Sequence, residues 1–169
     1  TVSHTAANDE ANNEHLFNEV ISLYSQDINR YAYWLTGNKH DAEDVIQETL
    51  LRAWKSLHKL ENMKAAKGWL FTILRRENAR RFERKRLEIS DVPMEELKAT
   101  ETSYDTSTEA FVLRRAIAEL DEEYRIPLVK QVIEGYSQKE IAEELGISTG
   151  GAGTRLFRAR NKLREVLAA

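Results

Sequence analysis

Cysteine is absent from this chain of 169 residues, proline occurs only twice, and glycine seven times. Without cysteine, disulfide bonds, thiolate metal ligands and thiol redox sensing are excluded within the chain. No run approaches 18 apolar residues and no basic, apolar and cleavable leader opens the chain, so we expect a soluble, unexported, cytoplasmic protein. Abundant helix formers, few helix breakers and no alternating strand pattern predict an all-α fold.

Catalytic and metal-binding patterns are also missing. The four histidines are scattered, and none lies four residues from another with a third ligand nearby. No Gly-x-Ser-x-Gly nucleophile motif occurs. We therefore expect no enzymatic activity, no cofactor and no metal.

The charges are strongly segregated, although the net charge is only −3. Residues 1–51 carry nine acids and two bases, whereas residues 52–86 carry twelve bases and three acids. A second basic cluster lies in residues 148–169, with five bases and one acid. Two basic regions separated by an acidic stretch predict two contacts with a polyanion.

Apolar periodicity predicts two small helical domains joined by a flexible linker. Residues 1–13 are polar and expected to fray, and helices are expected over about 14–36, 41–57 and 65–86. Residues 89–108 are rich in Ser, Thr, Asp and Glu, which indicates an acidic linker. The domains are therefore expected at 1–88 and 109–169. Asp41 is the expected N-cap of the second helix, an acidic amphipathic helix.

The second domain carries the pattern of a helix-turn-helix. Ser137 and Glu140 form a capping-box pattern, Gly146 can end the short helix, and Ser148 can cap a basic second helix. The residues expected to face inward are Ile141, Ala142, Leu145, Leu156 and Phe157. A helical hairpin within a bundle is the alternative interpretation.

Glycines interrupt the second helix of this motif at positions 150–153, which read Gly-Gly-Ala-Gly. Each interior glycine costs about 0.5–1 kcal/mol relative to alanine. We expect the amino end of this helix to be short, irregular or ordered only on DNA. The segment is not a phosphate-binding loop, because no lysine follows at the required position and no strand precedes it.

Taken together, these segments resemble the extracytoplasmic-function (ECF) sigma factors, the small two-domain specificity subunits of bacterial RNA polymerase. The matching segments are DAEDVIQET (41–49), LRAW (51–54), WL (69–70), REN (76–78), YSQKEIA (136–142), LGIS (145–148) and TRLFRAR (154–160). Each alone is weakly specific, whereas their order and spacing are specific. Related recognition helices usually carry a β-branched residue near position 152 and a larger polar or basic residue at 151 or 153, so this chain lacks side chains where the resemblance implies contacts with −35 bases.

The resemblance implies three binding surfaces. The acidic helix would dock on core polymerase, at the clamp helices of its β′ subunit, and the β subunit is a further part of that partner. The residues implied in this contact are Asp41, Glu43, Asp44, Gln47, Glu48 and Arg52. The −10 promoter element would meet Trp69, Arg75, Arg76, Asn78, Arg80, Arg81, Arg84 and Lys85. The −35 element would meet Ser148, Thr149, Thr154, Arg155, Arg158 and Lys162. Trp69 and Phe71 offer aromatic faces for an unstacked base, although core packing is the more common role at such spacing.

The resemblance also implies partners: core RNA polymerase, promoter DNA and an anti-sigma factor, which in this family is often anchored in the membrane. Arg160 and Arg164 are equally consistent with DNA contact and with solvated surface. A conventional helix-turn-helix regulator, binding duplex DNA as a dimer without polymerase, is the alternative function. An RNA-binding or scaffolding helical protein is a third interpretation, which no aromatic-rich sheet motif favours.

Overall fold

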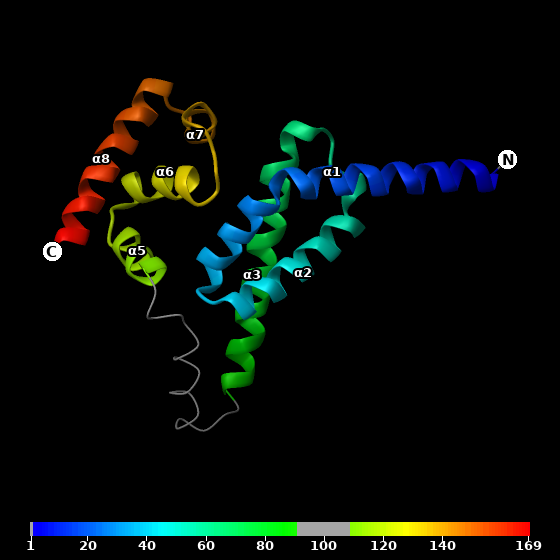
Figure 1. Ribbon diagram of the computed structural model, residues 1–169, viewed down its shortest axis with the longest axis horizontal. Coiled ribbons are helices and arrows are strands. Elements are labelled where there is room, and N and C mark those ends of the chain that lie inside the picture. Colours follow the sequence, from blue (N-terminus) through cyan, green and yellow to red (C-terminus); the bar gives the residue numbers. More distant parts are fainter. Residues whose placement is uncertain (1, 91–108) are drawn as a thin grey trace. The chain divides into compact units, whose positions relative to one another are not determined.

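Helices make up every regular element in residues 2–90 and 109–169, the part of the chain that the computed structural model describes (Figure 1). The helices group into two units, Thr1–Leu97 and Lys98–Ala169, which are described separately below. The prediction of an all-α, two-unit fold is confirmed. Residues 91–108, which include most of the expected linker, lie outside the described residues. None of the described helices is both long enough and apolar enough to span a bilayer.

The first unit contains three long helices. These are α1 (Val2–Thr36), α2 (Lys39–Lys55) and α3 (Ala66–Ser90), with short 3-10 turns at Leu57–Lys59 and Met63–Ala65 between the last two. Each of the three helices packs against the other two, as Figure 1 shows for the blue, cyan and green ribbons. The acidic helix α2 therefore packs against the basic helix α3.

An apolar core holds these three helices together. The largest fully buried side chains are Val20, Ile28, Val45, Leu70, Phe71 and Leu74. Phe71 contacts Tyr31 edge to face, with ring centroids 5.1 Å apart, which joins α3 to α1. Burying a side chain of this size contributes about 1.5–3 kcal/mol, so this contact stabilises the packing of α3 against α1.

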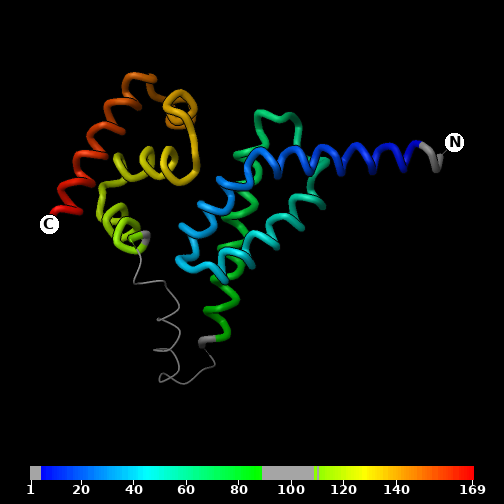
Figure 2. Tube along the Cα trace, in the orientation of Figure 1, coloured from blue at the N-terminus to red at the C-terminus, as the bar shows by residue number. Residues whose placement is uncertain are grey.

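Two expected helix boundaries in this unit are wrong. Helix α1 begins at Val2 rather than near residue 14, and the blue part of the tube in Figure 2 extends well before that position. The side chains of residues 5–15 are all exposed. Adding turns to a helix that already exists avoids the cost of nucleation, so a polar stretch with several alanines continues it. The N-cap of α2 is Asn38, not Asp41: the Asn38 side chain accepts a hydrogen bond from the Asp41 backbone N–H at 2.8 Å.

The second unit contains α5 (Glu109–Ala118), α6 (Glu122–Val132), α7 (Gln138–Leu145) and α8 (Thr149–Ala168). Helix α8 contacts each of the other three. Its buried face consists of Ala152, Leu156 and Ala159, which follow one another at intervals of four and three residues. The core residues from the other helices include Ile117, Leu128, Ile141 and Ala142.

The predicted caps of the helix-turn-helix are confirmed. The Ser137 hydroxyl accepts from the Glu140 backbone N–H at 3.1 Å, and the Glu140 carboxylate accepts from the Ser137 backbone N–H at 3.2 Å. Gly146 ends α7 with φ +65°, in the left-handed region that favours glycine. Ser148 caps α8 by accepting from the Gly151 backbone N–H at 2.9 Å.

Two expectations for α8 are wrong. Phe157 was expected to face the core but is 66% exposed, because the buried face of α8 is formed by the smaller residues Ala152, Leu156 and Ala159. The glycine-rich segment 150–153 lies within regular helix, so the amino end of α8 is neither short nor irregular as two of the three expected alternatives had it. The Ser148 cap at its start and the fully buried Ala152 within it offset the low helix propensity of the three glycines.

Candidate interaction surfaces

The acidic helix α2 presents its predicted polymerase-binding residues in two different environments. Glu43, Gln47 and Glu48 are exposed, and no described residue forms an ion pair with either of these two glutamates. Asp41 and Asp44 are partly buried because they face the basic helix α3. The exposed group is therefore available to a partner, whereas the two aspartates already have partners within the fold.

The contact between α2 and α3 is an ion-pair cluster. Arg81 pairs with Asp41 and, at 3.3 Å, with Asp44, and it also donates to the Asp41 backbone carbonyl at 2.7 Å. Lys85 pairs with Asp41 at 3.1 Å. Two of the bases predicted to bind −10 DNA thus lie against two of the acids predicted to bind polymerase.

The pKa of Asp41 reflects this environment. Burial by itself raises that pKa, since it penalises the charged carboxylate. Hydrogen bonds from Asn38, Lys85 and Arg81, together with the positive charge of Arg81, outweigh the burial. The pKa of Asp41 consequently lies below its usual value, and the carboxylate stays ionised.

A second cluster surrounds Glu77, a charged residue that is only 3% exposed. Arg52 from α2 and Arg80 from α3 approach the same carboxylate oxygen, Oε1, each at 3.0 Å. Both arginine side chains remain about half exposed, at 50% and 49%. Arg52 and Arg80, predicted as contacts to polymerase and to DNA, therefore also neutralise a buried charge.

This role of Glu77 was not predicted from the sequence. The available signal was its position: it is an isolated acid in a basic segment, and it follows Leu70 and Leu74 at helical spacing, on the side of α3 that faces the core.

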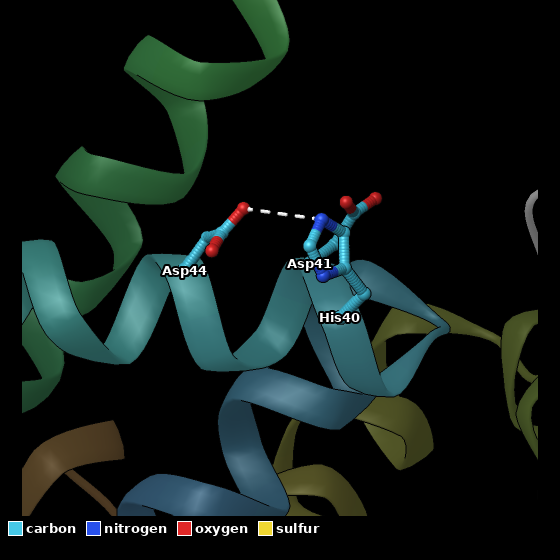
Figure 3. Close-up of side chains that lie close together, drawn as sticks. All are labelled: His40, Asp41 and Asp44. Carbon is cyan, nitrogen blue, oxygen red and sulfur yellow. Dashed lines mark ion pairs between the residues drawn. The ribbon is translucent and has the colours of Figure 1, made fainter.

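Three potential metal ligands, His40, Asp41 and Asp44, lie close together at the start of α2 (Figure 3). Figure 3 shows His40 and Asp44 as an ion pair, with 3.7 Å between Nε2 and Oδ2. The carboxylate oxygens, however, are already contacted by Arg81 and Lys85, and the His40 side chain is 83% exposed. A metal ion would have to displace these two cations, so the arrangement fits an ion-pair cluster.

Helix α3 divides its predicted DNA-binding residues into free and engaged groups. Arg76 and Arg84 are exposed and form no ion pair with any described residue. Arg75 donates to the Tyr31 hydroxyl and to the Thr72 hydroxyl, each at 3.4 Å, and is exposed beyond them. Asn78 is partly exposed, which leaves its amide accessible to a ligand.

The two aromatic candidates on α3 differ in exposure. Phe71 is fully buried against Tyr31, so stacking of a base on its ring is excluded by the packing. Trp69 is partly exposed, and its ring is the remaining aromatic candidate of the pair.

On α8, the predicted −35 residues begin at the capped end. The Ser148 hydroxyl is occupied by the Gly151 backbone N–H, and the Thr154 hydroxyl donates to the Gly150 carbonyl at 3.1 Å. Thr149 is exposed, and its backbone carbonyl accepts a hydrogen bond from the Gln138 side chain at 2.8 Å. The Gln138 contact was not predicted from the sequence.

Further along α8, the basic residues differ in how far they are engaged. Arg158 is exposed and has no ion-pair partner among the described residues. Arg155 lies 3.9 Å from Glu123 of α6, and the Lys162 ammonium lies 5.2 Å from the centre of the Tyr124 ring. Arg160 donates a hydrogen bond to the Gln131 side-chain carbonyl, and Arg164 donates to Asn161 at 3.1 Å, so both have contacts within the unit.

Comparison with known families places both units. Sequence models of Sigma-70 region 2 and Sigma-70 region 4 match residues 20–88 and 110–163, respectively. The ECF RNA polymerase sigma factor SigL of Mycobacterium tuberculosis is 34% identical over 143 residues, which cover 82% of this chain and 81% of SigL. The corresponding figures for SigM of Bacillus subtilis are 30% over 152 residues, 88% and 93%. SigE of Mycolicibacterium smegmatis is 32% identical over 160 residues, and the match spans 62% of its length.

Solved structures give the same result. CnrH, solved in complex with the cytosolic domain of CnrY, matches with a TM-score of 0.57 and 25% identity over 96% of this chain and 94% of that one. The sigma factor RpoE, solved with the anti-sigma factor NepR from Bartonella quintana, gives 0.56 and 26% over 90% and 97%. Two family models in the expected order, relatives covered over most of their length and sigma-factor structures agree: the chain belongs to the ECF sigma factors of bacterial RNA polymerase.

Proposed function

We propose that this chain binds core RNA polymerase through α2, recognises the −10 and −35 promoter elements through α3 and α8, and helps to open the promoter. The observation that carries the proposal is the arrangement of the first unit, in which an acidic exposed face on α2 adjoins a basic exposed face on α3. A regulator that only binds duplex DNA has no use for the acidic face. The chain would act in the cytoplasm, where the polymerase is, without catalytic chemistry or a cofactor of its own.

Within α2, the exposed residues Glu43, Gln47 and Glu48 are the proposed primary contacts with the polymerase β′ clamp helices. Carboxylates and amides on an accessible helical face suit a basic coiled-coil surface, because complementary charge speeds association and fixes register. Asp41, Asp44 and Arg52 would contribute at the edge of this face. Their pairing with α3 keeps α2 and α3 in one fixed arrangement.

Within α3, Arg76 and Arg84 are the proposed direct phosphate contacts, since neither is engaged in an ion pair with a described residue. Arg75, Arg80, Arg81 and Lys85 would add positive potential while holding the helix in place. Asn78 and Trp69, both partly exposed, are the proposed contacts with an unpaired base of the −10 element.

Within the second unit, α8 is the proposed major-groove helix. Arg158 is exposed and is the proposed principal side-chain contact with −35 DNA. Thr149 would contact the sugar-phosphate backbone near the amino end of the helix, with Ser148 and Thr154 holding that end in shape. Arg155 and Lys162 would contribute charge from partly engaged positions.

Control by an anti-sigma factor is part of the proposal. Two similar structures were solved as complexes, one with the anti-sigma factor NepR and one with the cytosolic domain of CnrY. The exposed polymerase- and DNA-binding faces of this chain would be the surfaces that such a partner covers. A membrane-anchored partner would hold the chain at the cytoplasmic surface of the membrane.

The experiment that tests the proposal measures affinity for core polymerase and salt dependence on promoter DNA. Glu43→Lys should weaken binding to core polymerase at least about tenfold, because reversed charge at a complementary interface costs several kcal/mol. Glu10→Lys makes the same charge change on the exposed amino-terminal part of α1 and should leave the affinity unchanged. Equal losses in both variants would refute the assignment of α2.

A second pair of variants tests the DNA surface. In the polymerase complex, Arg84→Ala should lower the slope of log affinity against log salt by about 1, as expected for one lost phosphate contact. Lys39→Ala, at the exposed start of α2, should leave that slope unchanged. An unchanged slope for Arg84→Ala would remove this residue from the promoter contact.

A further inference from the structure

A side chain from α7 crosses onto the first turn of α8. Gln138, the first residue of α7, donates from Nε2 to the backbone carbonyl of Thr149 at 2.8 Å. This contact joins the amino ends of the two helices of the helix-turn-helix. It is a side-chain bond between the helices, beyond the apolar contacts in their shared core.

Glycine at position 153 makes room for this side chain. A Cβ atom there would lie 2.7 Å from Gln138 Nε2, closer than real Cβ atoms approach, and 3.2 Å from Gln138 Cδ, which is tighter than most real Cβ contacts. A Cβ at Gly150, by contrast, would meet nothing within 4 Å. The observed position of Gln138 therefore requires a glycine at 153, whereas it places no steric limit on residue 150.

The contact leaves Gln138 with unused hydrogen-bonding capacity. Its amide has two N–H donors and one carbonyl acceptor, and only one N–H is needed for the Thr149 carbonyl. The other N–H and Oε1 form a donor–acceptor pair. In the major groove, this pair matches the N7 and N6 groups of adenine, which is the edge that glutamine reads in DNA-binding proteins.

The position of the amide suits this role. In a helix-turn-helix, residues at the amino end of the second helix contact the bases. Gln138 is hydrogen-bonded to the backbone of Thr149, the first residue of α8. Gly153, by removing a side chain from this turn, thus leaves space for a side chain from α7.

We propose that Gln138 is a specificity-determining residue that reads an adenine in the −35 element, and that Gly153 is the positioning residue that allows it to reach there. The inference rests on the proposed function, since it requires the second unit to bind −35 DNA. In this arrangement, one side chain from α7 takes the place of the side chains expected at positions 151 and 153 of a recognition helix.

The test uses the full chain with core polymerase and a set of promoters in which each −35 base pair is replaced in turn. Wild-type protein should prefer A·T at one position, and Gln138→Ala should lose about 5- to 10-fold of that preference, the size of a good base contact. Gly153→Ala should lose the same preference, because its Cβ displaces the amide. The double variant should lose no more than either single variant.

Two measurements separate base reading from a merely structural role. Gly153→Ala should not lower the melting temperature, because alanine favours the helix and the displaced atoms are the flexible end of a side chain. Gly150→Ala makes the same substitution without touching Gln138, so it should keep the base preference whatever its overall affinity.

The outcomes distinguish this inference from the proposed function. If wild-type protein gives no polymerase-dependent transcription with a −35 preference, the proposed function fails and the inference fails with it. If wild-type protein shows that preference and Gln138→Ala retains it at every position, the inference alone is overturned. Additive losses from Gln138→Ala and Gly153→Ala would also overturn the positioning role of Gly153.

Discussion

Glu77 provides a quantitative test of how the first unit is held together. Its carboxylate is buried, and Arg52 and Arg80 share the same oxygen at 3.0 Å. Removing one arginine leaves the other in place, and both arginines are about half exposed, so each single alanine variant should cost about 0.5–1.5 kcal/mol. Removing both leaves an uncompensated buried charge, which costs about 3–5 kcal/mol. The coupling free energy should therefore be about 2 kcal/mol.

Tryptophan fluorescence during urea unfolding is the assay. All three tryptophans, Trp34, Trp54 and Trp69, belong to the first unit, so the signal follows that unit alone. The midpoint should fall in the variants without a change in the slope m. A control that removes Arg76 and Arg84, which form no ion pair with described residues, should cost under about 1 kcal/mol in total.

Additive costs for Arg52→Ala and Arg80→Ala, or a double variant that loses less than about 2 kcal/mol, would refute this reasoning. Such a result would mean that water reaches the Glu77 carboxylate once the arginines are gone. If the coupling is found, loss of promoter activity in Arg80→Ala would reflect the fold as well as the proposed DNA contact. Arg84→Ala is then the cleaner variant for assigning the DNA surface.

Three further predictions concern single sites. Because the pKa of Asp41 is lowered in the folded state, its contribution to stability is present above about pH 4, the unfolded pKa, and is lost as the pH falls through the lower folded value. Asp41→Asn should therefore reduce the loss of stability on acidification, measured by unfolding between pH 6 and pH 2. An unchanged pH profile would contradict the assignment. Ser148→Ala removes the cap of α8 and should cost about 1 kcal/mol in thermal unfolding followed by circular dichroism, with Ser148→Asp retaining most of the stability. Ala152→Leu inserts a larger side chain at a fully buried position and should cost about 1–3 kcal/mol in the same assay; a neutral result would show that α8 can shift to accommodate it.

Local features of the fold were predictable because they depend on neighbouring residues. The capping box at Ser137 and Glu140, the glycine that ends α7 and the serine that caps α8 each involve residues within four positions. The long helices of the first unit were likewise indicated by apolar residues at helical spacing. The predicted N-cap of α2, Asp41, lies three residues after the actual one, Asn38, because both residue types suit an N-cap and only the backbone path distinguishes them.

Features that depend on distant residues were not predictable. The pairing of Arg81 with Asp41 joins residues forty positions apart, so a residue predicted to contact DNA also holds two helices together. Phe157 was misplaced because apolar size suggested burial, whereas small alanines allow α8 to pack closely through another face. The order of charged blocks indicated the surfaces, but the division into free and engaged side chains required the three-dimensional arrangement.

The central claim is that this chain directs RNA polymerase to promoters, and in vitro transcription tests it most directly. Core polymerase would be supplied with a promoter library in the presence and absence of the protein, and duplex DNA binding by the protein alone would be measured in parallel. We expect transcripts that start only when the protein is present, downstream of a shared two-part element, with little specific binding by the protein alone. Specific binding to duplex DNA as a dimer, with no start site that depends on the protein, would contradict it.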